Sequence, residues 1–396
     1  MQTHTARTLR WLAVAAAALS LLAACSKNKN PDQPAKLAPI KSTLRVRHIW
    51  SASVESGWHI FGDGGIAQLR LGLGLAVDGT RVYASGHGGE IAAFDLKTGH
   101  RLWTTNTRLP LGGGPAVRGD LLVAGATDGH VVALNAATGK RLWTVLINGS
   151  VISAPAIADN VVAVRSVDGK LRGLSPTDGH ELWEAGQDVP SLSLRGTSTP
   201  VIAGDLIICG FDNGKVLAVN ASDGSQAWQA TVSSPHGRTE IERLADVDGP
   251  VSVAGNDVYA VGYHGNVTML ALKNGQTWWA HKASSFRGLA LGKDAVYMST
   301  ADGQVVALDR ANGAVIWRQP ALRYRSLTAV AVSADAVITG DFQGYVHFLD
   351  KRTGAFIARV RAGGARISNP PIVRGNEVVV INDDGRISAY RMSPRT

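Results

Sequence analysis

One candidate for chemistry is a pair of aspartates two positions apart. The segment Asp246-x-Asp248-Gly249 has the start of a calcium loop but lacks the third acidic position and the terminal glutamate of an EF-hand, so we expect no metal ion there. The eleven histidines show no HxH or HExxH spacing, and no Gly-x-Ser-x-Gly or P-loop pattern is present. The sequence therefore argues against metal-assisted, acyl-transfer and phosphoryl-transfer chemistry.

A second candidate has residues suited to binding another protein. Leu192 and Leu194 alternate with serines, so in an extended segment both side chains face the same way. The adjacent Arg195 completes the combination of apolar anchors and arginine that is typical of interface hot spots. We expect these three residues to form a partner-binding surface together with Asp246 and Asp248.

Another interpretation of the same residues stays open. The two leucines would belong to the core, and Arg195 would pair with Asp246 or Asp248 and so join the two segments. Both arrangements can hold at once. Glu240 and Arg243, which precede the aspartates, are expected to support the surface.

Both segments interrupt a repeat that covers most of the chain. Asp-Gly and related turns between short β-branched runs indicate hairpins, and the first turn of each repeat closes on Gly89, Gly129, Gly169, Gly214, Gly265, Gly303, Gly344 and Gly385. A second turn follows ten residues later in seven repeats, at Gly99, Gly139, Gly179, Gly224, Gly275, Gly313 and Gly354. Four strands in about 40 residues are the content of a propeller blade. We predict an all-β, eight-bladed β-propeller with four-stranded antiparallel blades.

A tryptophan lies four residues after the second glycine in six repeats, and Ala358 stands at this position in the seventh. One tryptophan on each outer strand can bury about 150–250 Å². We therefore expect blade-to-blade packing, and not the lining of a cofactor site, from Trp50, Trp103, Trp143, Trp183, Trp228, Trp279 and Trp317.

The eighth repeat lacks its second turn, because the chain ends soon after Gly385 and one further strand. We predict that Leu44–Ser53, which includes Trp50, supplies the missing outer strand. The N- and C-terminal strands would then share one blade, and the closed ring would have no exposed sheet edge. The extra length lies before the fourth and fifth blades, in the two segments described above, and loops on rigid scaffolds commonly carry function.

The first 24 residues are expected to be a signal peptide, with Arg7 and Arg10 before an apolar run that is too short to span a bilayer. Leu22-Ala23-Ala24-Cys25 resembles a bacterial lipobox, so Cys25 is the expected lipidation site. Ser26 follows, and not the aspartate that retains such lipoproteins in the inner membrane, which implies the periplasmic face of the outer membrane. Residues 25–43 are polar and proline-rich and predict a flexible tether, with the propeller over 44–396.

The formal net charge is +9, and arginines crowd the connections around the last three blades: Arg318, Arg323, Arg325, Arg359, Arg361 and Arg366. A basic, solvated surface is our interpretation, with an anionic membrane or an acidic partner as alternatives. Without interleaved aromatic residues, the pattern does not indicate nucleic-acid binding.

Taken together, the lipobox, the tether, the eight blades and the segments 191–196 (SLSLRG) and 239–248 (TEIERLADVD) resemble the BamB family of lipoproteins in the outer-membrane β-barrel assembly (BAM) complex. The resemblance implies a non-enzymatic scaffold without a cofactor. It also implies binding to the POTRA domains of BamA through the five site residues named above. Unfolded outer-membrane protein clients are a further expected partner.

The alternative function is a quinoprotein-like propeller that binds a small ligand, or a degenerate dehydrogenase. Quinoprotein dehydrogenases resemble this chain in their blade motif but are longer, and typically place two adjacent cysteines beside the cofactor. Here the two cysteines, Cys25 and Cys209, are far apart, and Cys209 lies in an apolar run that indicates an inert core thiol.

Overall fold

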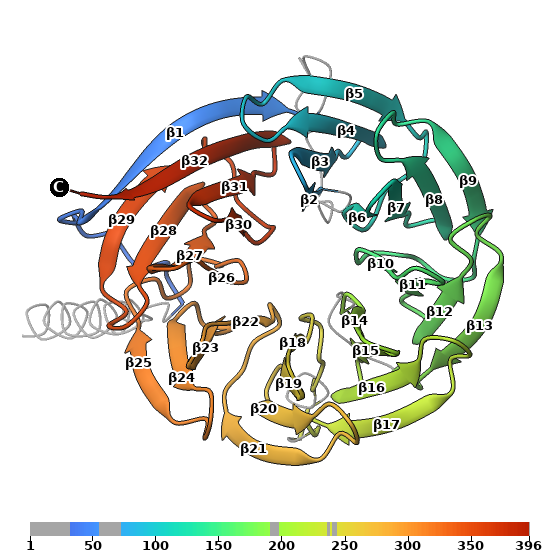
Figure 1. The fold of residues 1–396 in the computed structure, drawn as a ribbon. Coiled ribbons are helices and arrows are strands. Elements are labelled where there is room, and N and C mark those ends of the chain that lie inside the picture. The colour runs from blue at the N-terminus through green and yellow to red at the C-terminus, as the bar shows by residue number, and fades with distance from the viewer. Residues whose placement is uncertain (1–31, 55–72, 191–197, 236–237, 240–243, 396) are drawn as a thin grey trace, which may run out of the picture.

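The computed structural model describes residues 32–54, 73–190, 198–235, 238–239 and 244–395. Eight four-stranded antiparallel sheets stand around a ring (Figure 1). The predicted all-β, eight-bladed propeller is confirmed. In the part of the chain described here, no helix is long and apolar enough to cross a membrane.

The first four blades follow one another along the chain, each running from an inner first strand to an outer fourth strand. Blade one is β2 (Gly74–Asp78), β3 (Arg81–Ser85), β4 (Glu90–Asp95) and β5 (Arg101–Asn106). Blade two is β6 (Ala116–Arg118), β7 (Leu121–Gly125), β8 (His130–Asn135) and β9 (Arg141–Leu146). Blade three is β10 (Ala156–Ile157), β11 (Val162–Arg165), β12 (Lys170–Leu174) and β13 (Glu181–Gly186). Blade four is β14 (Val201–Ala203), β15 (Leu206–Gly210), β16 (Lys215–Asn220) and β17 (Gln226–Thr231).

The remaining blades continue the ring back to its start. Blade five is β18 (Ser252–Ala254), β19 (Asp257–Val261), β20 (Asn266–Ala271) and β21 (Thr277–Lys282). Blade six is β22 (Leu289–Leu291), β23 (Ala295–Ser299), β24 (Val305–Asp309) and β25 (Val315–Gln319). Blade seven is β26 (Ala331–Val332), β27 (Ala336–Gly340), β28 (Tyr345–Asp350) and β29 (Phe356–Arg361). Blade eight is β30 (Ile372–Arg374), β31 (Glu377–Ile381), β32 (Arg386–Pro394) and β1 (Leu44–Ser53).

Blade eight closes the ring with strands from both ends of the chain. β1 pairs antiparallel with β32 along its whole length, from Leu44 opposite Pro394 to Ser53 opposite Arg386. The prediction that the N-terminal strand completes the last blade is therefore confirmed. Since the sheets are arranged in a closed ring, apolar side chains meet between blades, and the described core consists of one apolar cluster at each of the eight blade junctions.

The outer-strand tryptophans lie at these junctions. Trp103, for example, donates its indole N–H to the carbonyl of Ala136 in blade two at 3.0 Å, and its ring covers Gly139. The same arrangement recurs seven times around the ring, as Trp50 on Gly99, Trp103 on Gly139, Trp143 on Gly179, Trp183 on Gly224, Trp228 on Gly275, Trp279 on Gly313 and Trp317 on Gly354. We call each such pair a tryptophan latch.

A β-bulge precedes each latch tryptophan. In blade one, Trp103 pairs with Ala93 but Arg101 pairs with Phe94, so Leu102 has no position of its own in the ladder. The extra residue points outward and is exposed. This explains why large apolar side chains are exposed on several outer strands, at Leu102, Leu142, Leu182, Trp278 and Ile316.

The chain gives the ring two distinct faces. The turns between second and third strands and the blade-to-blade connections lie on one face, which we call the loop face. The turns between first and second strands and between third and fourth strands lie on the other, the turn face. In the sequence, both long segments singled out above fall between the last strand of one blade and the first strand of the next.

Part of the predicted tether is held against the ring. Ala35 donates its backbone N–H to the carbonyl of Arg323, and Thr43 donates to the carbonyl of Ile357. Leu37 packs against the apolar cluster between blades six and seven. A flexible tether thus remains a prediction only for the chain before residue 34.

The latches predict which glycines are essential. Gly139 has φ +73°, and a Cβ there would lie 2.5 Å from Cε3 of Trp103. Gly119 has φ +56° but no atom within 4 Å of such a Cβ, so Gly119→Ala measures backbone strain alone. We expect Gly119→Ala to cost about 1–2 kcal/mol, and Gly139→Ala to cost about 1–3 kcal/mol more because it displaces the indole. Thermal and denaturant unfolding would measure both, and equal losses would contradict a role for the latch.

Candidate partner-binding surface

The structure describes only part of the predicted site. Asp246 and Asp248 lie in the connection from β17 to β18, on the loop face. The other predicted residues lie outside the described residues: Leu192, Leu194, Arg195, Glu240 and Arg243. The geometry of the site must therefore be taken from the two aspartates and from the residues that flank the leucines.

The connections before blades four and five meet. Ser198, three residues after Arg195, is buried, and its hydroxyl donates to the carbonyl of Gly249 at 3.1 Å. Gly249 directly follows Asp248. The two bonded residues belong to different connections, about 50 residues apart in sequence. The hydrogen bond therefore brings the two connections together on the loop face.

Neighbouring blades fix the path of the second connection. Val247 donates its N–H to the carbonyl of Phe211 in blade four at 3.1 Å, and Tyr263 in blade five donates to the carbonyl of Asp246 at 2.7 Å. A Cβ on Gly210 would lie 2.3 Å from the oxygen of Val247, so only glycine allows this close approach. The connection is thus wedged between two blades.

This wedging buries Asp246 and partly buries Asp248. Asp246 is only 1% exposed, and Oδ1 of Asp248 is enclosed without a hydrogen bond from any described residue. Burial raises the pKa of Asp248 well above its ordinary value, and the nearby Asp246 and Asp212 raise it further. Because Asp246 lies beneath the surface, it can influence a partner only through the residues above it.

Two arginines supply positive charge to the same region. Arg165 is fully buried, approaches Asp212 at 3.3 Å and lies over the ring of Phe211, 4.4 Å from its centroid. Burial also raises the pKa of Asp212, while Arg165 lowers it. Arg287 follows blade five, and burial lowers its pKa to about 10, an effect increased by Arg366. Carboxylates and guanidiniums are thus concentrated on the loop face away from bulk water.

Cys209 lies directly beneath the first connection. It is fully buried, its thiol lies 3.5 Å from the carbonyl of Ser198, and burial raises its pKa to about 12. A thiol with so high a pKa stays protonated and unreactive at neutral pH. The protonated thiol therefore donates a structural hydrogen bond to the carbonyl of Ser198.

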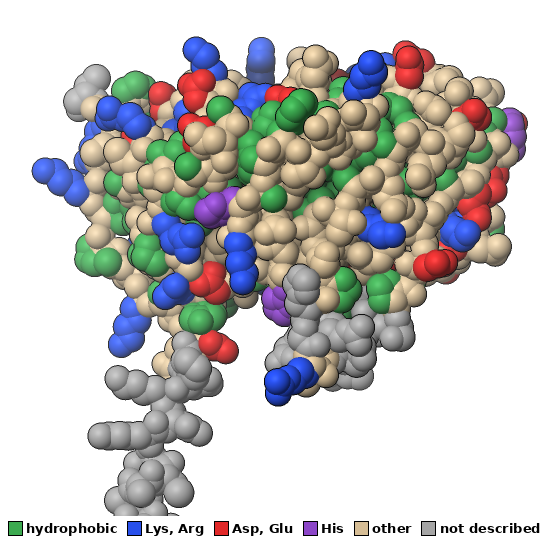
Figure 2. Space-filling model, turned by 90° about the horizontal axis from the view of Figure 1, so that it is seen from below, with side chains coloured by type: hydrophobic (Ala, Val, Ile, Leu, Met, Phe, Trp, Pro, Cys, Tyr) green, Lys and Arg blue, Asp and Glu red, His purple; other side chains and the backbone are tan. Residues whose placement is uncertain are grey.

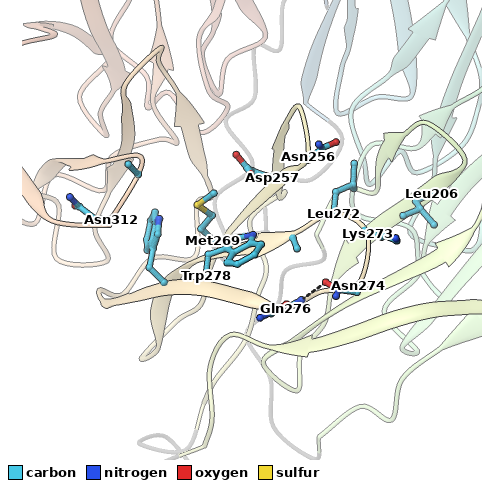
Figure 3. Close-up of a pocket in the computed structure, with 13 residues that line it drawn as sticks. Leu206, Asn256, Asp257, Met269, Leu272, Lys273, Asn274, Gln276, Trp278 and Asn312 are labelled. Carbon is cyan, nitrogen blue, oxygen red and sulfur yellow. Dashed lines mark hydrogen bonds between the residues drawn. The ribbon is translucent and has the colours of Figure 1, made fainter.

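A cleft on the opposite, turn face escaped sequence reasoning. It has a volume of about 920 Å³ and extends from blade four across blade five to blade six (Figure 3). Met269 and Leu272 line it beside Trp278, which is 58% exposed. Lys273 and Asp257 are its only ionisable lining residues, so the cleft offers apolar contact and not acid–base chemistry. The adjacent tryptophans Trp278 and Trp279 were the available signal, since neighbours on a strand face opposite ways.

The arginines of blades six to eight do not form a single surface. Lysine and arginine side chains do gather on the left of Figure 2, which is the side of β1, β25 and β29 in Figure 1. Arg318, Arg323 and Arg361 are exposed, as predicted for a basic surface. Arg325, however, is a buried residue that is ion-paired with Asp341, and the prediction is wrong for it.

Within the ranges that the structure describes, no group of three or more His, Cys, Asp or Glu side chains could hold a metal ion. The described part of the site thus consists of buried carboxylates and guanidiniums in wedged connections, an arrangement that suits binding.

Comparison with known proteins gives concordant results. The family model described as "Outer membrane protein assembly factor BamB" matches residues 87–319, more than half of the chain. Proteins of that name from Pseudomonas aeruginosa and Alkalilimnicola ehrlichii are 40% and 41% identical to it. The first alignment covers 96% of this chain and 97% of the relative, and the second covers 96% of each.

Solved structures give the same fold. The crystal structure of BamB from Moraxella catarrhalis matches with a TM-score of 0.79 and 26% identity, covering 88% of this chain and all of that one. Quinohemoprotein alcohol dehydrogenase from Comamonas testosteroni matches with a TM-score of 0.67 but only 13% identity, covering 87% of this chain and 76% of that one. The second likeness shows the propeller fold alone.

The partly buried Asp248 predicts a pH-dependent effect on stability. Because its pKa is raised in the folded state, the folded protein binds more protons than the unfolded chain above about pH 4, and Asp248 destabilises the fold increasingly as pH rises through the raised pKa. Asp248→Asn removes this penalty. We expect the melting temperature of the variant, relative to the parent, to increase between about pH 4 and about pH 8.

Asp294→Asn, at an exposed position, changes the net charge equally and serves as the control. It should alter the melting temperature little throughout. A melting-temperature difference for Asp248→Asn that stays constant or declines with pH would contradict the partly buried, destabilised carboxylate.

Proposed function

The chain belongs to the family of the outer membrane protein assembly factor BamB, and from this premise we propose that it is a non-catalytic scaffold of the outer-membrane β-barrel assembly machinery. It binds the POTRA domains of BamA and assists the assembly and insertion of outer-membrane proteins. The observation that carries the proposal is the alignment with a relative of that name over 96% of this chain and 97% of the relative.

The contact with BamA lies on the loop face, where the connections before blades four and five meet. The hydrogen bond from Ser198 to Gly249 supports this location, because it brings the segment that follows Leu192, Leu194 and Arg195 next to Asp248. The two leucines supply apolar contact worth about 1.5–3 kcal/mol each if they are fully desolvated.

Arg195 has a double role in this proposal. Asp246 is almost fully buried, and a buried carboxylate is stable only when it is paired or hydrogen-bonded. Arg195 comes from the adjoining connection and bonds Asp246 or Asp248, which orients the leucines toward the partner. Arg243 and Glu240 support the same surface.

The propeller is attached to the outer membrane on its periplasmic side. Residues 1–24 are a signal peptide, Cys25 is lipidated, and the residues that follow Cys25 form the flexible tether to the ring. The lipobox-like sequence that ends at Cys25 supports this. Several acyl chains make such an anchor stable, at about 0.8 kcal/mol for each buried CH₂.

The BamA contact can be tested by pull-down with Leu192→Ala, Leu194→Ala and Arg195→Glu proteins that keep the melting temperature of the parent. Each should recover less BamA, and Arg195→Glu should be weaker than Arg195→Ala because it introduces repulsion. Leu146→Ala is the control, since Leu146 is 67% exposed on the outer strand of blade two. Undiminished recovery by all three variants would place the interface elsewhere.

The pairing of Arg195 can be tested separately by a charge swap. Combining Arg195→Asp with Asp248→Arg should recover part of the BamA binding that Arg195→Asp alone removes. If the swap recovers none while both single variants remain folded, Arg195 bonds the partner directly and not Asp248. The same swap with Asp246→Arg examines the second aspartate.

The anchor can be tested by Cys25→Ser in a chain given a cleavable signal peptide. We expect a soluble periplasmic protein with the β-type circular dichroism spectrum and melting temperature of the parent, because the lipid lies outside the folded ring. Membrane association that survives the substitution, measured by fractionation, would show that another feature attaches the chain.

A further inference from the structure

The N-terminal arm, which we define as residues 34–43, lies along the outside of blade seven. Near its start, Ala35 donates to the carbonyl of Arg323 at 3.0 Å, and at its end Thr43 donates to the carbonyl of Ile357 in β29 at 2.9 Å. The chain leading into β1 thus passes beside β29 (Figure 1). The arm runs from the loop face toward the turn face, because Arg323 is in a blade-to-blade connection and Ile357 is near the start of β29.

Two arginines hold the arm by its backbone. Arg325 donates from Nη1 to the carbonyl of Ala35 at 2.9 Å, and Arg359 donates from Nη1 to the carbonyl of Ala38 at 3.0 Å. Hydrogen bonds from charged donors are stronger than those between neutral groups. Neither bond depends on the side chain of the arm residue, so a segment of simple composition can still be bound at a defined position.

Asp341 and His347, a buried pair of side chains, hold both arginines in position. Arg325 donates from Nε to Oδ2 of Asp341 at 2.8 Å, His347 contacts the same oxygen through Nε2 at 2.9 Å, and Arg359 donates from Nε to Nδ1 of His347 at 3.1 Å. The side chains of Asp341 and His347 are fully buried. Since Nδ1 accepts a hydrogen bond, His347 is neutral with its proton on Nε2, and burial lowers its pKa.

This row of four side chains is what we call the clasp: Arg325, Asp341, His347 and Arg359. Burial alone would raise the pKa of Asp341, but its bonds with His347 and Arg325 hold the pKa below the ordinary value. Asp341 also accepts the backbone N–H groups of Gln343 and Tyr345 at Oδ1. Each guanidinium is therefore fixed in position before it meets the arm.

The clasp faces the junction of blades six and seven, because His347 lies beside Phe356, which packs with Leu37 against the apolar cluster there. The next junction, between blades seven and eight, has no tryptophan latch. A latch needs the turn between the third and fourth strands of the next blade, and blade eight has no such turn, because its third strand ends at the C-terminus and its fourth is β1. A tryptophan at position 358 would have no glycine to cover, and Ala358 stands there instead. Leu44 and Met392 of blade eight pack with Ala358 in the apolar cluster between blades seven and eight.

The arm bridges this junction. Thr43 is bonded to Ile357 of blade seven, and Ser42 accepts a hydrogen bond at 3.1 Å from Arg395, which follows β32 in blade eight. Nearer its start, the arm is bonded to the connection after blade six through Arg323 and to blade seven through Arg359. Beyond Thr43 the arm continues directly into β1.

We propose that the clasp, at the junction of blades six and seven, is a binding site for the protein's own N-terminal arm. The arm held there then closes the junction of blades seven and eight, which has no latch, through Ser42 and Thr43. The chain before the arm then leaves the ring at one fixed point, at the edge of the loop face between blades six and seven.

The position of this point matters if Cys25 is lipidated, and this consequence rests on the proposed function. Only nine residues (26–34) would separate the lipid from the clasp, which at full extension span roughly 30 Å. The lipid anchor would then hold blades six to eight nearest the membrane.

Hydrogen exchange on the unlipidated chain 26–396 tests the clasp without involving Cys25 or BamA. In the parent protein, the amides of Ala35 and Thr43 should be protected. Arg325→Met combined with Arg359→Met keeps the apolar stems but removes the donors. We expect exchange at Ala35 and Thr43 to accelerate at least about tenfold, while the amides of β16 keep their rates.

Arg310→Met is the matched control, because Arg310 also donates to backbone carbonyls, those of Gly292 and Lys293, but far from the arm. It should leave the exchange of the arm unchanged. Parent amides at Ala35 and Thr43 that exchange at the rate of an unstructured peptide would overturn the proposal.

A truncated chain that starts at Thr43 gives a second readout with the clasp residues intact. It should unfold at a temperature several degrees below that of 26–396. Equal melting temperatures would show that the arm does not act as a latch, whatever the outcome for BamA binding or lipidation.

Discussion

The ring depends on one repeated contact, a tryptophan of one blade laid on a glycine of the next. The indole face fits only where no Cβ intervenes, and the indole N–H meets a carbonyl of the same turn, as Trp50 does with Leu96 at 2.8 Å. Burial of one such ring contributes at most about 4–6 kcal/mol, and its hydrogen bond adds about 1 kcal/mol. Because the ring is closed, each latch also keeps every other blade in place. The single junction that cannot hold a latch therefore has to be closed by other contacts.

The latch also explains how much of the fold could be predicted. Tryptophan and glycine recur at constant spacing in the sequence, so the number of blades, the strands in each blade and the closing role of β1 could be derived from the residues. The docking of the arm could not. Its partners Arg325 and Arg359 lie 290 and 321 residues away from the carbonyls they bind, and a polar, proline-rich segment favours no structure by itself.

The candidate site shows a similar limit. Unequal repeat lengths identified the two connections, because extra residues in a regular propeller must lie outside the blades. The burial of Asp246 could not be predicted, since it is produced by Gly210, Phe211 and Tyr263 in the neighbouring blades. A sequence pattern distinguishes a polar loop from a strand. It does not show whether a carboxylate in that loop is exposed to water or buried by neighbouring blades.

The blade junctions and the connections before blades four and five thus contribute differently to stability. Latches and apolar clusters stabilise the blade junctions, whereas the connections of blades four and five hold a carboxylate, Asp248, whose ionisation is unfavourable where it lies. A fold that depended on these connections would lose stability whenever such a group ionised, because a carboxylate removed from water costs free energy unless it is paired. The closed ring can keep it, since the blades remain paired and packed whatever the charge of Asp248. The loop face can therefore carry residues chosen for binding at the expense of local stability.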